Sequence, residues 1–218
     1  MTAVGGRGDA VRSFVAIVLP DAIRAELAAA VARLRAQAPR LAWVPAENLH
    51  LTLRFLGGLD PVALAAAGEA VAAAAATAAP FQVVLGGLGG FPSARAPRVV
   101  WAGVVAGGEA LAALHRSLER ELAARGFPPE ERPYHAHVTL GRARDPRGGR
   151  ALADALGAAA RFGALQVVAL HLLRSELGRE AARYSELLRA PLGGRPRAAG
   201  DAGLDGYSSS VDMPEGPP

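Results

Sequence analysis

The sequence lacks cysteine and lysine and is poor in aromatic residues. Without cysteine, disulfide frameworks, thiolate zinc sites and cysteine nucleophiles are all excluded. All 24 basic residues are arginines, and only 5% of residues are aromatic although 51% are hydrophobic. Much of the hydrophobic fraction is alanine, yet 218 residues suffice for one domain with its own core. The excess of alanine, glycine and arginine is a bias of composition that indicates no particular function.

Long hydrophobic runs are also missing. The longest stretch without a charged residue, 70–94, contains Pro80, Pro92 and four glycines, which excludes a membrane-spanning helix. The short run 14–19 is followed at once by Pro20 and Asp21, and it predicts a buried first strand rather than the core of a signal peptide. We therefore expect a soluble, cytoplasmic protein without membrane contact.

Charge is distributed unevenly along the chain. The formal net charge is +4, yet residues 193–218 carry two arginines against four acidic residues. Between residues 132 and 150, five arginines stand against a single acidic residue, Asp145. This local excess of positive charge is compatible with an anionic partner.

Hydrophobic periodicity predicts strands and helices that alternate along the chain. The expected strands cover residues 13–19, 41–44, 49–56, 81–88, 98–105, 136–140, 164–173 and 183–188. The expected helices cover about 21–38, 61–79 and 109–125, with a weaker one at 149–160, and a Gly/Pro-rich loop covers 86–97. We expect a disordered N-terminus over 1–11, a single α+β domain over 12–192, and a disordered tail over 193–218, where large apolar residues are scarce.

One tetrapeptide pattern, His-apolar-Thr-Leu, occurs twice. It begins at His50 and again at His137, 87 residues later. Side chains alternate between the two faces of a strand, so each histidine shares a face with its threonine, Thr52 or Thr139. The intervening apolar residues can then enter a core. Two copies at corresponding places in two halves of the chain predict two similar lobes.

This pattern suits acid–base chemistry on a phosphodiester. If the two lobes face each other, two imidazoles and two hydroxyls line one cleft. Imidazole titrates near neutral pH, so one ring can accept a proton while the other donates one, and no metal is needed. A single His-x-Thr is a weak signal. Two copies with matching alternation, in a chain with five histidines, are much less expected by chance.

The other three histidines carry weaker signals. His115 lies among charged residues in an expected helix, which predicts a solvated face. His171 alternates with leucines in a strand and can face either solvent or the edge of a cleft. His135 and His137 form a possible metal pair, but no further ligand set lies near them in the sequence. We therefore expect neither a metal nor a cofactor.

At this point the chain resembles the 2H phosphoesterase superfamily, and within it the RNA 2′,3′-cyclic phosphodiesterase branch, also called 2′-5′ RNA ligase-like. The resemblance covers about residues 12–190 in order and spacing. Residues 12–17 resemble the opening strand of the family, 50–57 its first motif, 97–101 its middle strand, 134–142 its second motif, and 173–178 with Tyr184 its closing hairpin. His135 and Gly141 depart from the pattern, and the tail after 192 has no counterpart.

The resemblance implies a bilobal 2H phosphoesterase fold, with two pseudo-symmetric lobes, each an antiparallel sheet with flanking helices, around a central cleft. It also implies the opening of a 2′,3′-cyclic phosphate at an RNA end to leave a 2′-phosphate. By this resemblance His50 is the general acid (proton donor) and His137 the general base (proton acceptor). Thr52 and Thr139 would hold the non-bridging oxygens and stabilise the charge of the transition state.

Two arginines are candidates for binding the phosphate. Arg142 follows the second motif, as in the family, and a guanidinium suits a phosphate. Strict alternation places Arg142 on the face opposite His137, so it reaches the cleft only if Gly141 bends or bulges the strand, or if the strand has already ended. Arg54 has the same parity as His50 and is the second candidate, unless it simply faces solvent.

Two aromatic residues, Phe14 and Tyr184, are candidates for stacking on a nucleobase. Phe14 stands in an apolar run, which favours a place in the core instead. The expected partners are therefore RNA ends or nucleoside 2′,3′-cyclic phosphates. Nothing in the sequence indicates an obligate interface, so we expect a monomer.

Two other functions stay open on the same fold. One is a 2′-5′ RNA ligase or a 2′,5′-phosphodiesterase, which would use the same histidines on a different bond. The other is a non-catalytic RNA-binding module, whose sign would be salt-sensitive affinity without turnover. A pure binding module has no need for two histidines in matched settings, and we rate it below the enzyme.

Overall fold

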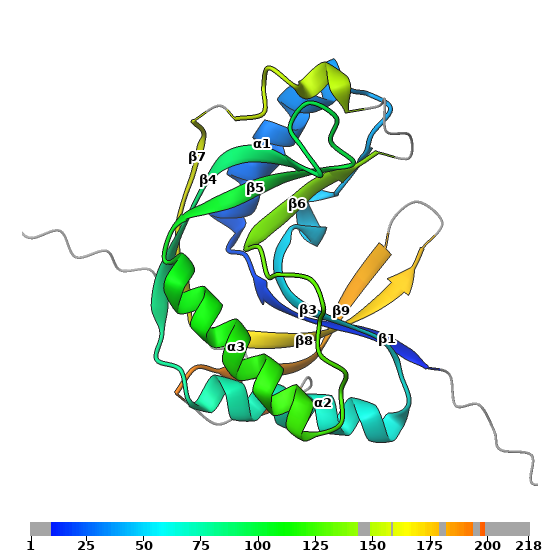
Figure 1. Ribbon diagram of the computed structural model, residues 1–218, viewed down its shortest axis with the longest axis vertical. Helices are drawn as coiled ribbons and strands as arrows, with labels where there is room; N and C mark the ends of the chain where they lie inside the picture. The colour runs from blue at the N-terminus through cyan, green and yellow to red at the C-terminus, as the bar shows by residue number, and fades with distance from the viewer. Residues whose placement is uncertain (1–9, 144–148, 158, 179–181, 194–196, 199–218) are drawn as a thin grey trace, which may run out of the picture.

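The computed structural model describes residues 10–143, 149–157, 159–178, 182–193 and 197–198 (Figure 1). Within these ranges the chain forms three α-helices, two short 3₁₀ helices and ten strands. In chain order these are β1 Val11–Val18, α1 Asp21–Gln37, β2 Ala42–Trp43, η1 Ala46–Asn48, β3 His50–Leu59, α2 Pro61–Ala76, β4 Phe81–Phe91, β5 Val99–Ala106, α3 Gly108–Ala124, β6 His137–Arg142, η2 Arg150–Leu152, β7 Arg161–Val167, β8 Ala169–Leu177, β9 Ala182–Pro191 and β10 Arg197–Ala198.

The strands form one curled antiparallel sheet made of two lobes. Its order is β10-β9-β8-β1-β3-β6-β5-β4-β7, and β2 pairs with β6. The two lobes meet where β3 lies beside β6, with Leu51 opposite Val138. Figure 1 shows how the halves curve away from this junction. The predicted α+β fold with two lobes is thereby confirmed.

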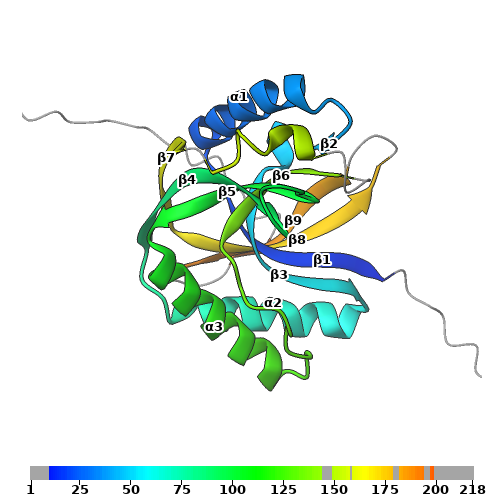
Figure 2. The same cartoon turned by 45° about the horizontal axis from the view of Figure 1, so that its top comes forward.

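Helices cover the outer surface of both lobes and cross between them. α1 follows β1, which belongs to the first lobe, but packs on β7 and β6 of the second lobe. α3 follows β5 of the second lobe and packs on α2, which lies against β8 and β9 of the first (Figure 2). The lobes are therefore tied together by packed helices as well as by the sheet.

α3 shows how the sequence builds this core. Its buried leucines are spaced three or four residues apart, so they form one stripe on a helix. The stripe consists of Leu111, Leu114, Leu118 and Leu122, each at most 2% exposed. Each such leucine stabilises the fold by about 1.5–3 kcal/mol on leaving water. α2 is equally well buried but uses alanines, which gives it less apolar surface per residue.

The ends of the helices follow local signals in the sequence. The side chain of Asp60 accepts a hydrogen bond from the backbone N–H of Ala63 at 2.8 Å, and Pro61 occupies the first turn of α2. Gly107 precedes α3 with a positive φ of 80°, and a Cβ there would lie 2.2 Å from the carbonyl oxygen of Gln82. Only glycine fits this position.

Three predicted elements differ in the structure. Residues 149–160 do not form a helix, and only η2 remains there, between two glycines, Gly149 and Gly157. The expected strand 164–173 is part of two strands, β7 and β8, which belong to different lobes and are separated at Val168. The run 164–173 carries no sign of such a change, because it contains neither the glycine nor the proline that would mark a break.

The third difference is in β4, which continues through the expected glycine loop as far as Phe91. Gly89 is required there because Trp101 of β5 packs over it. A Cβ on Gly89 would lie 2.1 Å from the ring of Trp101. β1 also begins at Val11, inside the expected disordered terminus. The predictions of disorder for 1–9 and 199–218 lie outside the described residues, and within the expected tail Arg197–Ala198 pairs with β9 as β10.

No helix in the described part of the chain is long and apolar enough to cross a membrane.

Candidate active site

The two His-x-Thr motifs lie on adjacent strands at the centre of the sheet. Leu51 is paired with Val138 in an antiparallel register, so the continuation of this register brings His50 beside Thr139 and His137 beside Thr52. The histidines and threonines are half-buried, whereas the apolar residues between them are at most 4% exposed. The predicted alternation of faces is thus confirmed, and the two motifs meet at the pair Leu51 and Val138.

Each histidine is held by the same backbone contact. Nδ1 of His50 lies 2.8 Å from the carbonyl oxygen of Asn48, and Nδ1 of His137 lies 2.7 Å from that of His135. A carbonyl oxygen only accepts hydrogen bonds, so each Nδ1 carries a proton and donates it. In the neutral ring this leaves Nε2 unprotonated and able to accept a proton. Both rings are therefore set up for proton transfer at Nε2.

Aromatic side chains surround each imidazole. The ring of His50 lies 4.8 Å from that of Phe14 and 5.3 Å from that of Tyr184. The ring of His137 lies 5.2 Å from that of Phe91 and 6.4 Å from that of Trp101. These contacts fix the orientation of the imidazoles and remove them partly from water.

The surroundings lower the pKa of both catalytic candidates. Burial is the main cause for His50 and for His137, and the hydrogen bond to a backbone carbonyl opposes it in each case. The positive charge of Arg142 lowers the pKa of both histidines, and the charge of His137 further lowers the pKa of His50. One guanidinium therefore acts on both imidazoles, which places the three groups in one electrostatic site.

A β-bulge turns Arg142 toward this site. Arg142 lies opposite Val99 of β5, and Thr139 lies opposite Trp101. Two residues separate Thr139 from Arg142, but only one separates their partners, so β6 contains one extra residue beside Gly141. Val99 and Trp101 share a face of β5, and Arg142 therefore shares a face with Thr139. The bulge at Gly141 that Arg142 needs in order to reach the cleft is therefore present.

The same irregularity in β3 has the opposite consequence for Arg54. Thr52 lies opposite Ala16 of β1, and Arg54 lies opposite the next residue, Val15. Leu53 is thus an extra residue, and Arg54 leaves the face of Thr52. The parity expected for Arg54 is wrong for this reason, but Arg54 still lines the cavity described below, and its role in binding the substrate stays a prediction. Its side chain is only 8% exposed and forms ion pairs with Glu119 of α3 and with Glu130.

Phe55 is a candidate that the alternation rule missed. The bulge brings it to the open face, where it is 55% exposed and lies opposite Phe14. Phe14 itself is 2% exposed and belongs to a small buried cluster that Tyr184 packs against. The signal that would have found Phe55 is the repeat, because Phe55 follows His50 by five residues just as Arg142 follows His137.

A cavity of about 450 Å³ opens at this face. It is lined from β3 by Thr52, Arg54 and Phe55, from β6 by His137 and Arg142, and from α3 by His115. His50, Phe14 and Tyr184 do not line this cavity but pack on one another as a separate cluster. Burial raises the pKa of Tyr184, and the charge of Arg142 opposes this rise. The volume suits a nucleotide-sized ligand.

The remaining histidines lie in other settings. His115 is stacked on Tyr134, with ring centroids 4.0 Å apart and an angle of 8° between planes, so the expected solvated face is wrong. His171 is bonded through Nδ1 to Glu186 Oε2 at 2.6 Å. Within the described ranges, no group of three or more histidine or acidic side chains could hold a metal ion.

An antiparallel sheet of two lobes, with a His-x-Thr motif on each strand of the junction, defines a two-histidine phosphoesterase. The family model of the 2′-5′ RNA ligase superfamily matches residues 19–179, and the chain belongs to this family.

Relatives with known names and structures agree with this assignment. The chain is 34% identical over 179 residues to the RNA 2′,3′-cyclic phosphodiesterase of Methanothermobacter thermautotrophicus, a match that covers 81% of this chain and 96% of the relative. It is 37% identical over 143 residues to the protein of the same name from Aeropyrum pernix, covering 65% and 80%. E. coli LigT complexed with 3′-AMP superposes with a TM-score of 0.68 at 29% identity, covering 84% of this chain and 99% of LigT.

Proposed function

We propose that this protein hydrolyses 2′,3′-cyclic phosphates at RNA ends, or of nucleosides, to 2′-phosphomonoesters. The observation that carries the proposal is the pair of imidazoles on adjacent strands, each with Nδ1 tied to a backbone carbonyl and both under the charge of Arg142. The names of its curated relatives support the same reaction.

The proposed reaction is a displacement at phosphorus. Nε2 of neutral His137 accepts a proton from water while the water oxygen forms a bond to phosphorus. The bond between phosphorus and the 3′-oxygen breaks, and protonated His50 gives its Nε2 proton to that oxygen. One proton enters and one leaves, so the products are a 2′-phosphate and a free 3′-hydroxyl. The assignment of acid and base follows the family resemblance, since the two histidine tethers are alike.

The hydroxyl and guanidinium groups around the phosphate stabilise its negative charge. The phosphate carries a negative charge that grows in the transition state, and hydroxyl and guanidinium donors fixed around it stabilise this charge. In this proposal Thr52 and Thr139 donate to the two non-bridging oxygens, and Arg142 contributes its positive charge from the edge of the cavity. A bound phosphate also raises the pKa of the nearby imidazoles, which favours the protonated form that His50 needs.

The nucleoside is held beside the phosphate. Phe55 offers an exposed aromatic face in the cavity and Tyr184 a half-exposed one beside His50, so we propose these two as stacking partners for the base. Phe14, which the sequence also suggested, would support His50 and Tyr184 from below. That LigT has been solved with 3′-AMP supports a nucleotide-sized site in this fold.

The description of the family supports a second candidate, 2′-5′ ligation, which is the same displacement run with a ribose hydroxyl in place of water. Product analysis separates the two. The test is incubation with the four nucleoside 2′,3′-cyclic monophosphates, followed by phosphorus NMR. We expect the 2′-monophosphate only. A 3′-monophosphate would contradict the proposed leaving group, and 2′,5′-linked dimers formed from added nucleoside would favour ligation.

A monomeric state and a cytoplasmic location stay predictions.

A further inference from the structure

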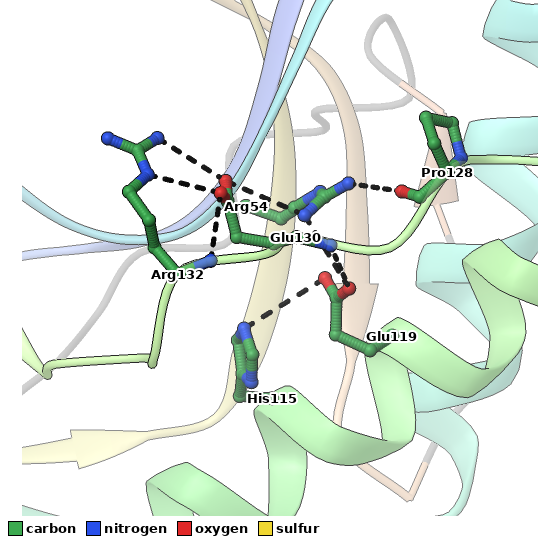
Figure 3. Close-up of polar contacts among 6 residues, drawn as sticks. All are labelled: Arg54, His115, Glu119, Pro128, Glu130 and Arg132. Carbon is green, nitrogen blue, oxygen red and sulfur yellow. Dashed lines mark hydrogen bonds and ion pairs between the residues drawn. The ribbon is translucent and has the colours of Figure 1, made fainter.

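Arg54 lies two residues after Thr52 on β3, buried between α3 and the connection that leads to β6. Its guanidinium donates to the carbonyl oxygen of Pro128 and lies 3.6 Å from the carboxylates of both Glu119 and Glu130 (Figure 3). Glu119 belongs to α3, whereas Pro128 and Glu130 belong to the connection. One buried side chain therefore joins three pieces of the molecule.

The connection itself ends at the second motif. Along it, the backbone N–H of Glu130 also donates to Glu119 at 3.4 Å, and Tyr134 is stacked on His115 of α3. The next residue, His135, supplies the carbonyl oxygen that accepts the Nδ1 proton of His137. The position of this carbonyl depends on how the connection is held, and Arg54 is bonded to the connection at two points.

We propose that Arg54 is a positioning residue for His137, which acts by holding the connection 125–136 so that the carbonyl of His135 stays aligned with Nδ1. Its importance for turnover depends on the proposed function, but its effect on the ring of His137 does not. Arg54 thus couples the two motifs: it extends from the strand of the first and orders the approach to the second.

A direct electrostatic effect of Arg54 is separable from this positioning effect. The charges that act on the pKa of His137 are those of Arg142 and His135, whereas the charge of Arg54 acts on His115. Removing a nearby positive charge would raise the pKa of an imidazole. Loosening a hydrogen bond in which Nδ1 donates to a carbonyl would lower it, because that bond favours the protonated ring. The sign of the change therefore identifies the cause.

The test is the titration and tautomer of each histidine by nitrogen NMR in the full-length protein, with Arg54→Met against wild type. We expect His137 to titrate at lower pH and to gain the tautomer protonated at Nε2, while His50, tied in the same way to Asn48, keeps its tautomer and serves as an internal control. Arg24→Met is the matched variant, since Arg24 lies outside the connection and likewise donates to a backbone carbonyl, that of Leu19, and pairs with a carboxylate, that of Asp21; it should leave both histidines unchanged.

Kinetics with a nucleoside 2′,3′-cyclic phosphate provide the second readout. A misplaced base costs turnover more than binding, so we expect Arg54→Met to lower kcat about tenfold or more with KM changed less than about twofold. Arg54→Lys, which keeps the charge but not the two-pronged geometry, should restore only part of kcat. If wild type does not hydrolyse the substrate, the proposed function fails, whereas the NMR measurement still decides the role of Arg54.

Two results would overturn the positioning role. One is an unchanged tautomer and titration of His137 in folded Arg54→Met. The other is an equal change in His50 and His137, which would indicate a general loosening of the fold. If Arg54→Met does not fold, Glu130→Gln replaces it, because Glu130 is partly exposed and its loss leaves Arg54 paired with Glu119. The same change in His137, smaller in size, is then expected, and no change in His137 would contradict the proposal.

Discussion

Leu51 and Val138 lie opposite each other where β3 meets β6, and neither side chain is exposed to solvent. This one pair sets the relation between the two motifs. It brings each histidine beside the threonine of the other motif, so that each half of the site combines groups from both lobes. A phosphate bound there would be held by both strands at once, and the two imidazoles would approach it from opposite sides.

Arg142→Met should weaken both binding and turnover. The variant loses the cation beside the phosphate, and we expect kcat/KM for a nucleoside 2′,3′-cyclic phosphate to fall about 10- to 1000-fold, in line with the loss of one charged donor to a transition state. Arg161→Met on β7, whose side chain is exposed and does not line the cavity, is the control. A kcat/KM within about twofold of wild type for Arg142→Met would exclude Arg142 from the site.

The dependence of kcat/KM on pH should be a bell whose maximum lies below about pH 6.5, the ordinary pKa of histidine. The active free enzyme carries one proton on the histidine pair. Since burial and Arg142 lower the pKa of both rings, both limbs of the bell move to lower pH. Arg142→Met should move the bell back to higher pH. A single sigmoid, or a maximum well above pH 7, would contradict the two-histidine scheme.

Phe55→Ala tests the stacking of the base. Base–aromatic stacking contributes about 1–3 kcal/mol, so KM for a nucleoside cyclic phosphate should rise about 5- to 150-fold. Val62→Ala, on a side chain that is 80% exposed on α2, is the control for lost apolar surface. Methyl riboside 2′,3′-cyclic phosphate, which has no base, should be hydrolysed equally by wild type and Phe55→Ala. An equal loss on both substrates would contradict the stacking role.

Gly89→Ala tests the packing beneath His137. The added Cβ would lie 2.1 Å from the ring of Trp101, which itself lies near His137. We expect a loss of about 1–3 kcal/mol in the free energy of unfolding by urea, together with reduced kcat. Gly108→Ala is the matched control, because a Cβ at the first residue of α3 meets nothing within 4 Å. It should leave activity unchanged and should not lower the free energy of unfolding, because alanine is the better helix former. If Gly89→Ala has the same free energy of unfolding as wild type, the packing argument is contradicted.

The alternation of side chains between the two faces of a strand was enough to predict which face carries the histidines and threonines of each motif. Leu51 and Val138 had to be buried, so His50 and His137 had to face outward together with their threonines. The bulges could not be placed in the same way, because they depend on the register against β1 and β5, which lie elsewhere in the sequence. Alternation alone therefore does not predict that Arg142 turns to the face of Thr139, that Arg54 leaves the face of Thr52, or that Phe55 is exposed there.

The most direct test of the account is the rate of cyclic phosphate hydrolysis in His50→Ala, His137→Ala and the double variant, with chelator present. Each single variant should lose about 10²- to 10⁴-fold in kcat, and the double variant should lose little more than either single one, because the two groups act in one step. The chelator should not change the rate of wild type. His171→Ala is the control for the loss of a histidine outside the site, and this variant should hydrolyse the substrate at the wild-type rate. Hydrolysis at the wild-type rate in either single variant, with the protein folded, would contradict the two-histidine mechanism.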